Sequence, residues 1–148
     1  MGNRYLVTFK NFLPAALTVP TLISGAGRRI RVLAASVGGG GATSAAQALV
    51  MSRSATGTTP GGAITPTPAE HAEQPASNFT TALTWAAAPA GATNGEVLPF
   101  NALGGGFRYT TTQKLPPIEA RNGEVISFIA PAGVTPQNTN LSVLVEED

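Results

Sequence analysis

Residues 120–133 read ARNGEVISFIAPAG, and this stretch decides the fold class. Near its start lies Asn122-Gly123, a dipeptide that favours a tight two-residue turn between strands. The run that follows alternates between the two faces of an extended chain and stops at Pro131 and Gly133. A segment bounded in this way is typical of a β-strand that has one buried face.

Segments of the same kind recur along the chain and are separated by turns rich in glycine, proline and alanine. After residue 27 they give about eight strands: RRIRVLAASVG (28–38), AAQALVMSR (45–53), FTTALTW (79–85), EVLPF (96–100), FRYTTT (107–112), LPPIEA (115–120), EVISFIA (124–130) and NLSVLVEE (140–147). The sequence shows neither an alternation of strands with helices nor a convincing amphipathic helix. The pattern therefore predicts an all-β domain, built as a sandwich or a barrel.

Composition agrees with this fold class. A chain of 148 residues forms one domain and buries about 70% of its unfolded surface. Only 11% of the residues are charged, and 17 glycines and 12 prolines are better suited to strands and turns than to surface helices. The absence of cysteine excludes disulfides, cysteine-based zinc sites and thiol nucleophiles.

The chain divides into two predicted regions. Residues 1–27 read as an extended N-terminal arm, because Pro14 and Pro20 interrupt them and a short strand-like segment, RYLVTFK, precedes the prolines. Residues 28–148 form the sandwich, and residues 54–78 form a long loop that holds prolines and glycines without a periodic pattern. A loop of this length is usually disordered, functional or packed on a neighbour, and the sequence leaves these possibilities open.

Charge is unevenly distributed along the sequence. Residues 1–69 contain six Arg and Lys and no acid, whereas residues 70–148 contain three cations and eight acids. Two interpretations remain: either the halves pair in space, or the basic arm docks on an acidic neighbour. The docking residues predicted for the arm are Arg4, Tyr5, Phe9, Lys10, Phe12 and Leu13. The cations are too sparse for nucleic-acid binding, and no apolar run is long enough to span a membrane.

Residues with catalytic or ligand-binding chemistry are few. His71 is the only histidine, and Glu70 and Glu73 lie beside it in a proline-rich loop where three metal ligands rarely converge. The glycine runs at 38–41 and 104–106 lack the Lys-Ser/Thr that follows a phosphate loop. We therefore expect no catalytic, cofactor-binding or metal residue and no enzyme activity. Trp85 is expected in the core, with sugar stacking as the alternative if its ring is exposed.

From residue 28 onward, the order of features resembles a group of small jelly-roll proteins of tailed phages that serve as capsid decoration (cement) or other virion structural proteins. The resemblance is carried by RRIRVLAASVG, ALVMSRSATGTTPGGAITPT (48–67), PPIEARNGEVISFIAPAGVT (116–135) and the closing LSVLVEED (141–148). Each motif is a strand pattern, not a chemical signature, and their order carries the likeness. It covers about four fifths of the chain and leaves the N-terminal residues unmatched.

This resemblance implies a jelly-roll sandwich and a mechanical function. A decoration protein binds the outside of an assembled phage head and stabilises it by contacts between subunits. The implied partners are the major capsid protein and further copies of the chain, in a homotrimer, and the implied location is the capsid surface. A receptor- or glycan-binding module of a phage fibre or spike is the alternative, which an exposed Trp85 or Tyr109 in a groove would favour. A major shell or portal-neck component is a third possibility.

Overall fold

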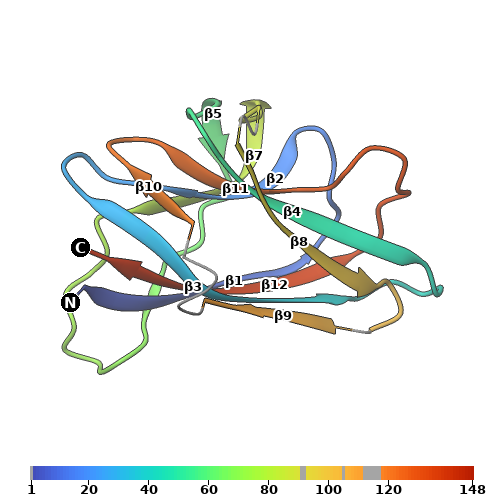
Figure 1. The fold of residues 1–148 in the computed structure, drawn as a ribbon, viewed down its shortest axis with the longest axis horizontal. Helices are drawn as coiled ribbons and strands as arrows, with labels where there is room; N and C mark the ends of the chain where they lie inside the picture. Colours follow the sequence, from blue (N-terminus) through green and yellow to red (C-terminus); the bar gives the residue numbers. More distant parts are fainter. Residues whose placement is uncertain (1, 91–92, 105, 112–117) are drawn as a thin grey trace.

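The computed structural model describes residues 2–90, 93–104, 106–111 and 118–148, and these ranges contain strands and turns without a helix. Because these ranges contain no helix, they contain no helical segment that could cross a membrane. Two antiparallel sheets pack face to face as a β-sandwich (Figure 1). The predicted all-β class is confirmed.

Each sheet combines strands from distant parts of the sequence. The first sheet has the order β10 (Glu119–Arg121), β3 (Arg29–Gly39), β12 (Thr139–Glu147), β1 (Asn3–Phe12) and β6 (Thr67–Pro68), and β9 (Gly106–Thr110) also pairs with β3. The second has the order β5 (Thr58–Gly61), β7 (Thr80–Ala87), β2 (Thr18–Ile23), β11 (Val125–Ile129), β4 (Ala46–Ser54) and β8 (Thr93–Asn101).

The core lies between the sheets, and period-two alternation explains which side chains enter it. In β12, Leu141, Val143 and Val145 are fully buried, and in β11 the neighbouring sheet contributes Ile126 and Phe128. Alternate residues of a strand face opposite sides of a sheet, so a strand such as β12 supplies every second side chain to the core, whereas β11 has buried residues on both of its faces. Burial of these side chains is the main favourable term that holds the two layers together.

The Asn122-Gly123 turn has the geometry that its sequence predicts. Both residues have positive φ, 51° and 86° respectively, and the amide of Glu124 donates a hydrogen bond of 3.0 Å to the carbonyl of Arg121. This tight turn carries the chain from β10 in one sheet to β11 in the other. Asparagine and glycine tolerate positive φ better than other residues, which explains the use of this dipeptide here.

The prediction of an extended N-terminal arm is wrong. Residues 3–12 form β1, which lies between β12 and β6, and residues 18–23 form β2, which lies between β7 and β11. Pro14 falls in the connection between these strands, and Pro20 falls where the pairing of β2 with β7 shifts register between Thr18 and Thr21. Because a strand tolerates proline at such an irregularity, neither proline prevents the segment from joining the sandwich.

The long loop at 54–78 packs along one side of the sandwich. Its β5 segment pairs with β7 of one sheet, and its β6 segment pairs with β1 of the other. The hydroxyl of Tyr5 donates to the carbonyl of Pro75 at 2.8 Å, and the Gln74 amide donates to the carbonyl of Arg4 at 2.6 Å. These bonds attach the loop to β1 and link the two layers on this side.

Candidate interaction surfaces

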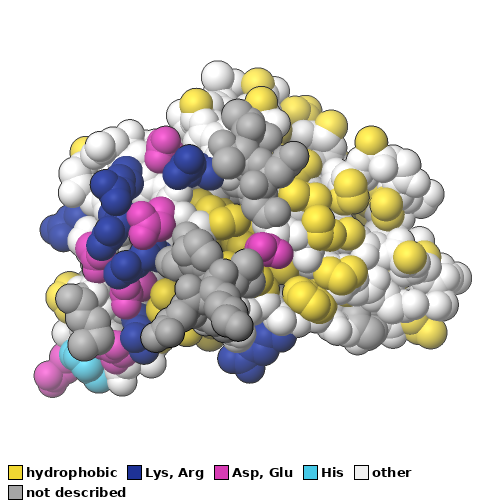
Figure 2. All heavy atoms as spheres, in the orientation of Figure 1, with side chains coloured by type: hydrophobic (Ala, Val, Ile, Leu, Met, Phe, Trp, Pro, Cys, Tyr) yellow, Lys and Arg dark blue, Asp and Glu magenta, His cyan; other side chains and the backbone are white. Residues whose placement is uncertain are grey.

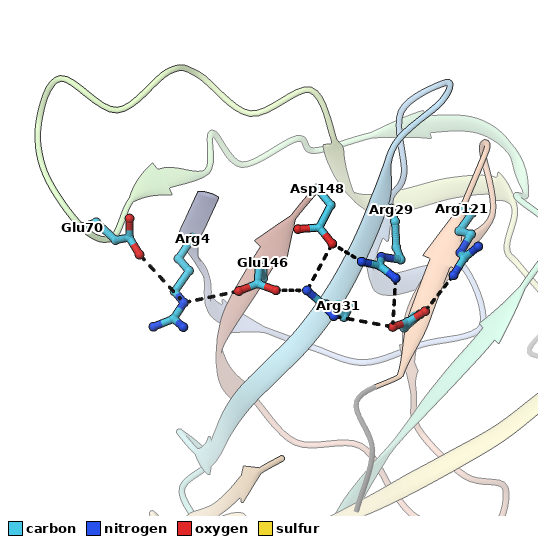
Figure 3. Close-up of polar contacts among 8 residues, drawn as sticks. Arg4, Arg29, Arg31, Glu70, Arg121, Glu146 and Asp148 are labelled. Atoms are coloured by element: carbon cyan, nitrogen blue, oxygen red, sulfur yellow. Dashed lines mark hydrogen bonds and ion pairs between the residues drawn. The ribbon is translucent and has the colours of Figure 1, made fainter. Parts of the chain in front are cut away.

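Ionic residues gather at the end of the sandwich where both chain termini lie (Figures 1 and 3). We call this group the terminal ionic cluster: Arg4, Arg29, Arg31, Glu70, Glu119, Arg121, Glu146 and Asp148. Its members come from β1, β3, β10, the end of β12 and the long loop at 54–78. The register of β3 against β12 and β10 brings most of the charges together.

Arg31 lies at the centre of the cluster and contacts three carboxylates. It pairs with Glu146, lies 3.1 Å from Asp148, and lies 4.0 Å from Glu119. Glu146 is only 5% exposed and has Arg4 on its other side at 3.6 Å. A carboxylate buried to this degree requires cationic partners, and Arg4 and Arg31 supply them.

Arg29 and Asp148 form the outer part of the cluster. The hydrogen bond from the Arg29 guanidinium, followed by the positive charges of Arg31 and Arg29, holds the pKa of the Asp148 carboxyl below its ordinary value. The same contact raises the pKa of Arg29. Both shifts favour the charged forms, as expected for an ion pair with hydrogen bonds.

The cluster decides between the two interpretations of the uneven charge. Cations of the first half pair in space with acids of the second half, so the interpretation that the halves neutralise each other is confirmed. Arg4, a predicted docking residue, is bound to Glu146 and Glu70 within the same chain. The contacts give this cluster a structural role, which is to fasten the last residues of β12 to β1 and β3.

The opposite end of the sandwich has a contrasting composition. It consists of the connections at 13–17, 40–45, 88–90, 102–104 and 130–138, and none of these contains Lys, Arg, Asp, Glu or His. We call this surface the uncharged end. Lys10, near the end of β1, is the cation nearest to it in sequence. On the face drawn in Figure 2, most charged side chains gather on the side of the termini, and the other side shows hydrophobic side chains among uncharged atoms.

A shallow apolar hollow of about 350 Å³ opens at the uncharged end. Among the residues that the structure describes, its lining consists of alanine, proline, valine and isoleucine: Pro14, Ala15, Ala16, Val19, Ala88, Pro89, Ala90, Ile129, Ala130, Pro131, Ala132, Val134 and Pro136. Beside it, Leu13 and Leu17 are 53% and 51% exposed. Because large exposed apolar patches often mark interaction sites, this surface is the candidate for contact with another protein.

The six docking residues predicted within residues 1–27 lie in different environments. Tyr5, Phe9 and Phe12 are buried in the core, where the rings of Phe9 and Phe12 meet edge to face with centroids 6.5 Å apart. They are therefore not free to dock on another protein, and their prediction as docking residues is corrected. Lys10 and Leu13 are exposed.

The other residues considered from the sequence have ordinary surroundings. His71 is exposed in the long loop, and Glu70 beside it faces Arg4 at 3.9 Å. In the ranges that the structure describes, no group of three His, Asp or Glu side chains is placed to hold a metal. Trp85 is 4% exposed and its indole N–H points to the Val19 carbonyl and the Thr21 hydroxyl at 3.3 Å, so its predicted core position is confirmed.

Tyr109 is the second aromatic residue on which the glycan-binding alternative depended. It is 4% exposed, and burial, with a further contribution from the charge of Glu96, raises the pKa of its hydroxyl. Neither Trp85 nor Tyr109 presents an open ring for stacking on a sugar. The alternative therefore lacks the observation that would favour it.

Sequence reasoning missed the uncharged end because its parts are far apart in the chain. A signal was available: five connections that are rich in alanine, proline and glycine contain no charge. Only the sheet topology shows that they share one end, because it fixes the direction of every strand.

Comparison with known proteins identifies no relative. Searches of family models, of curated proteins and of solved structures each found no match to this chain. The class that the fold defines is a two-layer antiparallel β-sandwich.

Proposed function

We propose that this chain is a structural protein of a phage particle, a capsid decoration protein that binds the outside of an assembled head and stabilises it. The observation that carries the proposal is the uncharged end, with its apolar hollow and exposed leucines. Such a surface is stabilised when another protein covers it, which is the situation of a subunit in a particle.

The order of strands supports the jelly-roll form of this proposal. Strands β1, β12, β3 and β9 lie side by side in one sheet, and β2, β11, β4 and β8 lie side by side in the other. When the strands are numbered along the chain without β5–β7 and β10, the order of these eight strands is the one expected for two Greek keys wound into a jelly roll. Segments β5 to β7 are then an insertion that widens both sheets. Virion proteins and lectins both use this fold, so the fold alone does not choose between them.

The distribution of charge supports attachment through the uncharged end instead of through an arm. The terminal ionic cluster satisfies its own charges within the chain, as the pairs of Arg29 and Arg31 show. The uncharged end requires no ionic partner. Contacts at this end are expected to depend on buried apolar area and to be insensitive to salt, because screening weakens interactions between exposed charges.

The proposal is tested by the composition of particles. Phage particles from the strain that encodes the chain are purified on a density gradient, and their proteins are identified and counted by mass spectrometry. We expect the chain to band with intact heads and to remain bound at high salt. Finding it only in the soluble fraction, or on tails separated from heads, would contradict the proposal. Binding of the purified chain to a glycan array would support the fibre alternative.

A further inference from the structure

We propose, independently of the proposed function, that Asn122 is a deamidation site that the fold holds closed. The buried hydroxyl of Ser24 is the group that holds it closed. The site lies in the Asn122-Gly123 turn, which links β10 of one sheet to β11 of the other.

An asparagine followed by glycine is chemically labile in an unfolded chain. The backbone nitrogen of Gly123 loses its proton and attacks the side-chain carbonyl carbon of Asn122, so that a C–N bond forms and the side-chain nitrogen leaves as ammonia. Water then opens the cyclic imide at either carbonyl and gives aspartate or isoaspartate. Glycine favours the reaction because it has no side chain to shield its nitrogen.

The surroundings of Asn122 offer no protection by burial or by charge. Its side chain is exposed, so water reaches it. It lines a hollow of about 450 Å³. The described residues of this hollow carry three positive charges, on Arg28, Arg29 and Arg121, and one negative charge, on Asp148. Net positive charge beside the reacting groups stabilises the anion that forms during the attack, so protection has to come from hydrogen bonds.

Ser24 holds the nitrogen that would attack. The backbone N–H of Gly123 donates to the Ser24 hydroxyl at 3.0 Å, and the same hydroxyl donates to the carbonyl of Glu124 at 2.9 Å. Ser24 is only 3% exposed, and its own amide also donates to the Glu124 carbonyl at 3.1 Å. The hydroxyl is thus fixed between two groups of the turn. Because breaking such a buried hydrogen bond leaves its partners unpaired, the Gly123 nitrogen is released only at a cost in free energy.

A second contact holds the group that would be attacked. The side-chain oxygen of Asn122 accepts a hydrogen bond from the backbone N–H of Gly27 at 3.1 Å. The side chain of Asn122 is therefore tied to Gly27, whereas the nitrogen of Gly123 is tied to Ser24. The attack brings these two groups into covalent contact, which their separate hydrogen bonds oppose. The turn must therefore open before it reacts.

Opening of the turn has a permanent consequence. Aspartate at position 122 adds a negative charge to the hollow, and isoaspartate inserts a methylene group into the backbone of the tight turn. Because hydrolysis releases ammonia and does not reverse, the fraction of deamidated chains measures how often this link between the two sheets has opened.

Peptide mapping by mass spectrometry, on the purified full-length chain kept for several weeks in mildly alkaline buffer, tests the proposal. The wild-type chain should form aspartate and isoaspartate at position 122 at least about tenfold more slowly than a synthetic peptide of residues 118–130, because only the folded chain has to open first. Ser24→Ala should speed the reaction at least about fivefold, because it removes both hydrogen bonds of the hydroxyl. Ser24→Cys replaces the hydroxyl by a thiol that is a weak acceptor, and it provides the test if Ser24→Ala does not fold.

Thr139→Ala is the matched control. The Thr139 hydroxyl is buried and donates to the carbonyl of Gln137 at 2.9 Å, and Thr139 begins β12 at the end of the sandwich away from the turn. This variant should deamidate at the wild-type rate, and thermal melting checks that every variant is folded. The proposal is wrong if the wild-type chain reacts as fast as the peptide, if folded Ser24 variants react at the wild-type rate, or if Thr139→Ala speeds the reaction as much as they do.

Discussion

Replacement of Phe9 by alanine tests whether the N-terminal residues belong to the core. Phe9 is 1% exposed, pairs with Leu141 of β12, and packs within the central core cluster. Truncation of a buried phenylalanine removes its transfer free energy and leaves a cavity, at a cost of about 3–5 kcal/mol. A domain of this size has a free energy of unfolding of about 5–15 kcal/mol, so this single change removes about a fifth of it or more.

Urea denaturation followed by circular dichroism and by Trp85 fluorescence measures the effect. For a small domain, the free energy of unfolding falls by about 1–3 kcal/mol per molar urea, so the midpoint should move down by more than about 1 M. Lys10→Ala is the matched control, because Lys10 is the next residue of β1 and is exposed. It should change stability by no more than about 0.5 kcal/mol. Equal midpoints for the two variants would refute the placement of β1 in the core and would restore the extended arm.

Three further predictions concern other parts of the sandwich. A Cβ at Gly39 would collide with the carbonyl oxygens of Asn101 and Ala102, whereas one at Gly38 would meet nothing within 4 Å. Gly39→Ala should therefore lower the melting temperature, and Gly38→Ala should change it little. Equal effects would contradict the close approach of β3 to the end of β8. The Glu147 carboxylate is 5% exposed and accepts a hydrogen bond from the backbone N–H of Asn78 at 3.0 Å. Glu147→Ala should therefore lower the free energy of unfolding by about 2 kcal/mol, measured by urea denaturation. An unchanged midpoint would show that this bond contributes nothing to stability. The pKa of Asp148 is lower in the folded state than its ordinary value of 3.8, so its contribution to stability is present above that value and is lost as pH falls through the lower folded pKa. Melting temperature should therefore fall less steeply in Asp148→Asn than in the wild type below about pH 4, and parallel curves would argue against this linkage.

The sequence was sufficient to predict the strands that show regular alternation. The segments around Val32, Leu49 and Val143 alternate, and each forms a strand with these residues buried. The segment around Ile126 also forms a strand, but it is buried on both faces and not on one as its pattern predicts. Pairing of the charged halves was also predictable as one of two interpretations, because Arg31 and Glu146 carry opposite charges on strands of a single domain.

The sequence was not sufficient where structure depends on contacts between distant segments. Pro20 interrupts the pattern of β2, and only the register shift opposite β7 shows why the strand tolerates it. Segments β5 and β6 are four and two residues long and contain Pro60 and Pro68, so they have no alternation to detect. They form because β7 and β1 offer unpaired edges to them.

The candidate site was beyond sequence reasoning for the same physical reason. A functional residue can be recognised in a sequence when its side chain has distinctive chemistry, as those of His71 and Trp85 do. The hollow is built from alanine, proline, valine and isoleucine, which have no such signature. The hollow forms because the topology places several uncharged connections at the same end of the sandwich.

The central claim is that another protein covers the uncharged end when the chain is assembled. If the chain decorates a phage head as proposed, an electron cryo-microscopy map of that head tests the claim most directly. We predict that the sandwich will be seen with Leu13, Leu17 and the hollow buried against a protein neighbour. A map in which that end faces solvent while the terminal ionic cluster is buried would contradict the account.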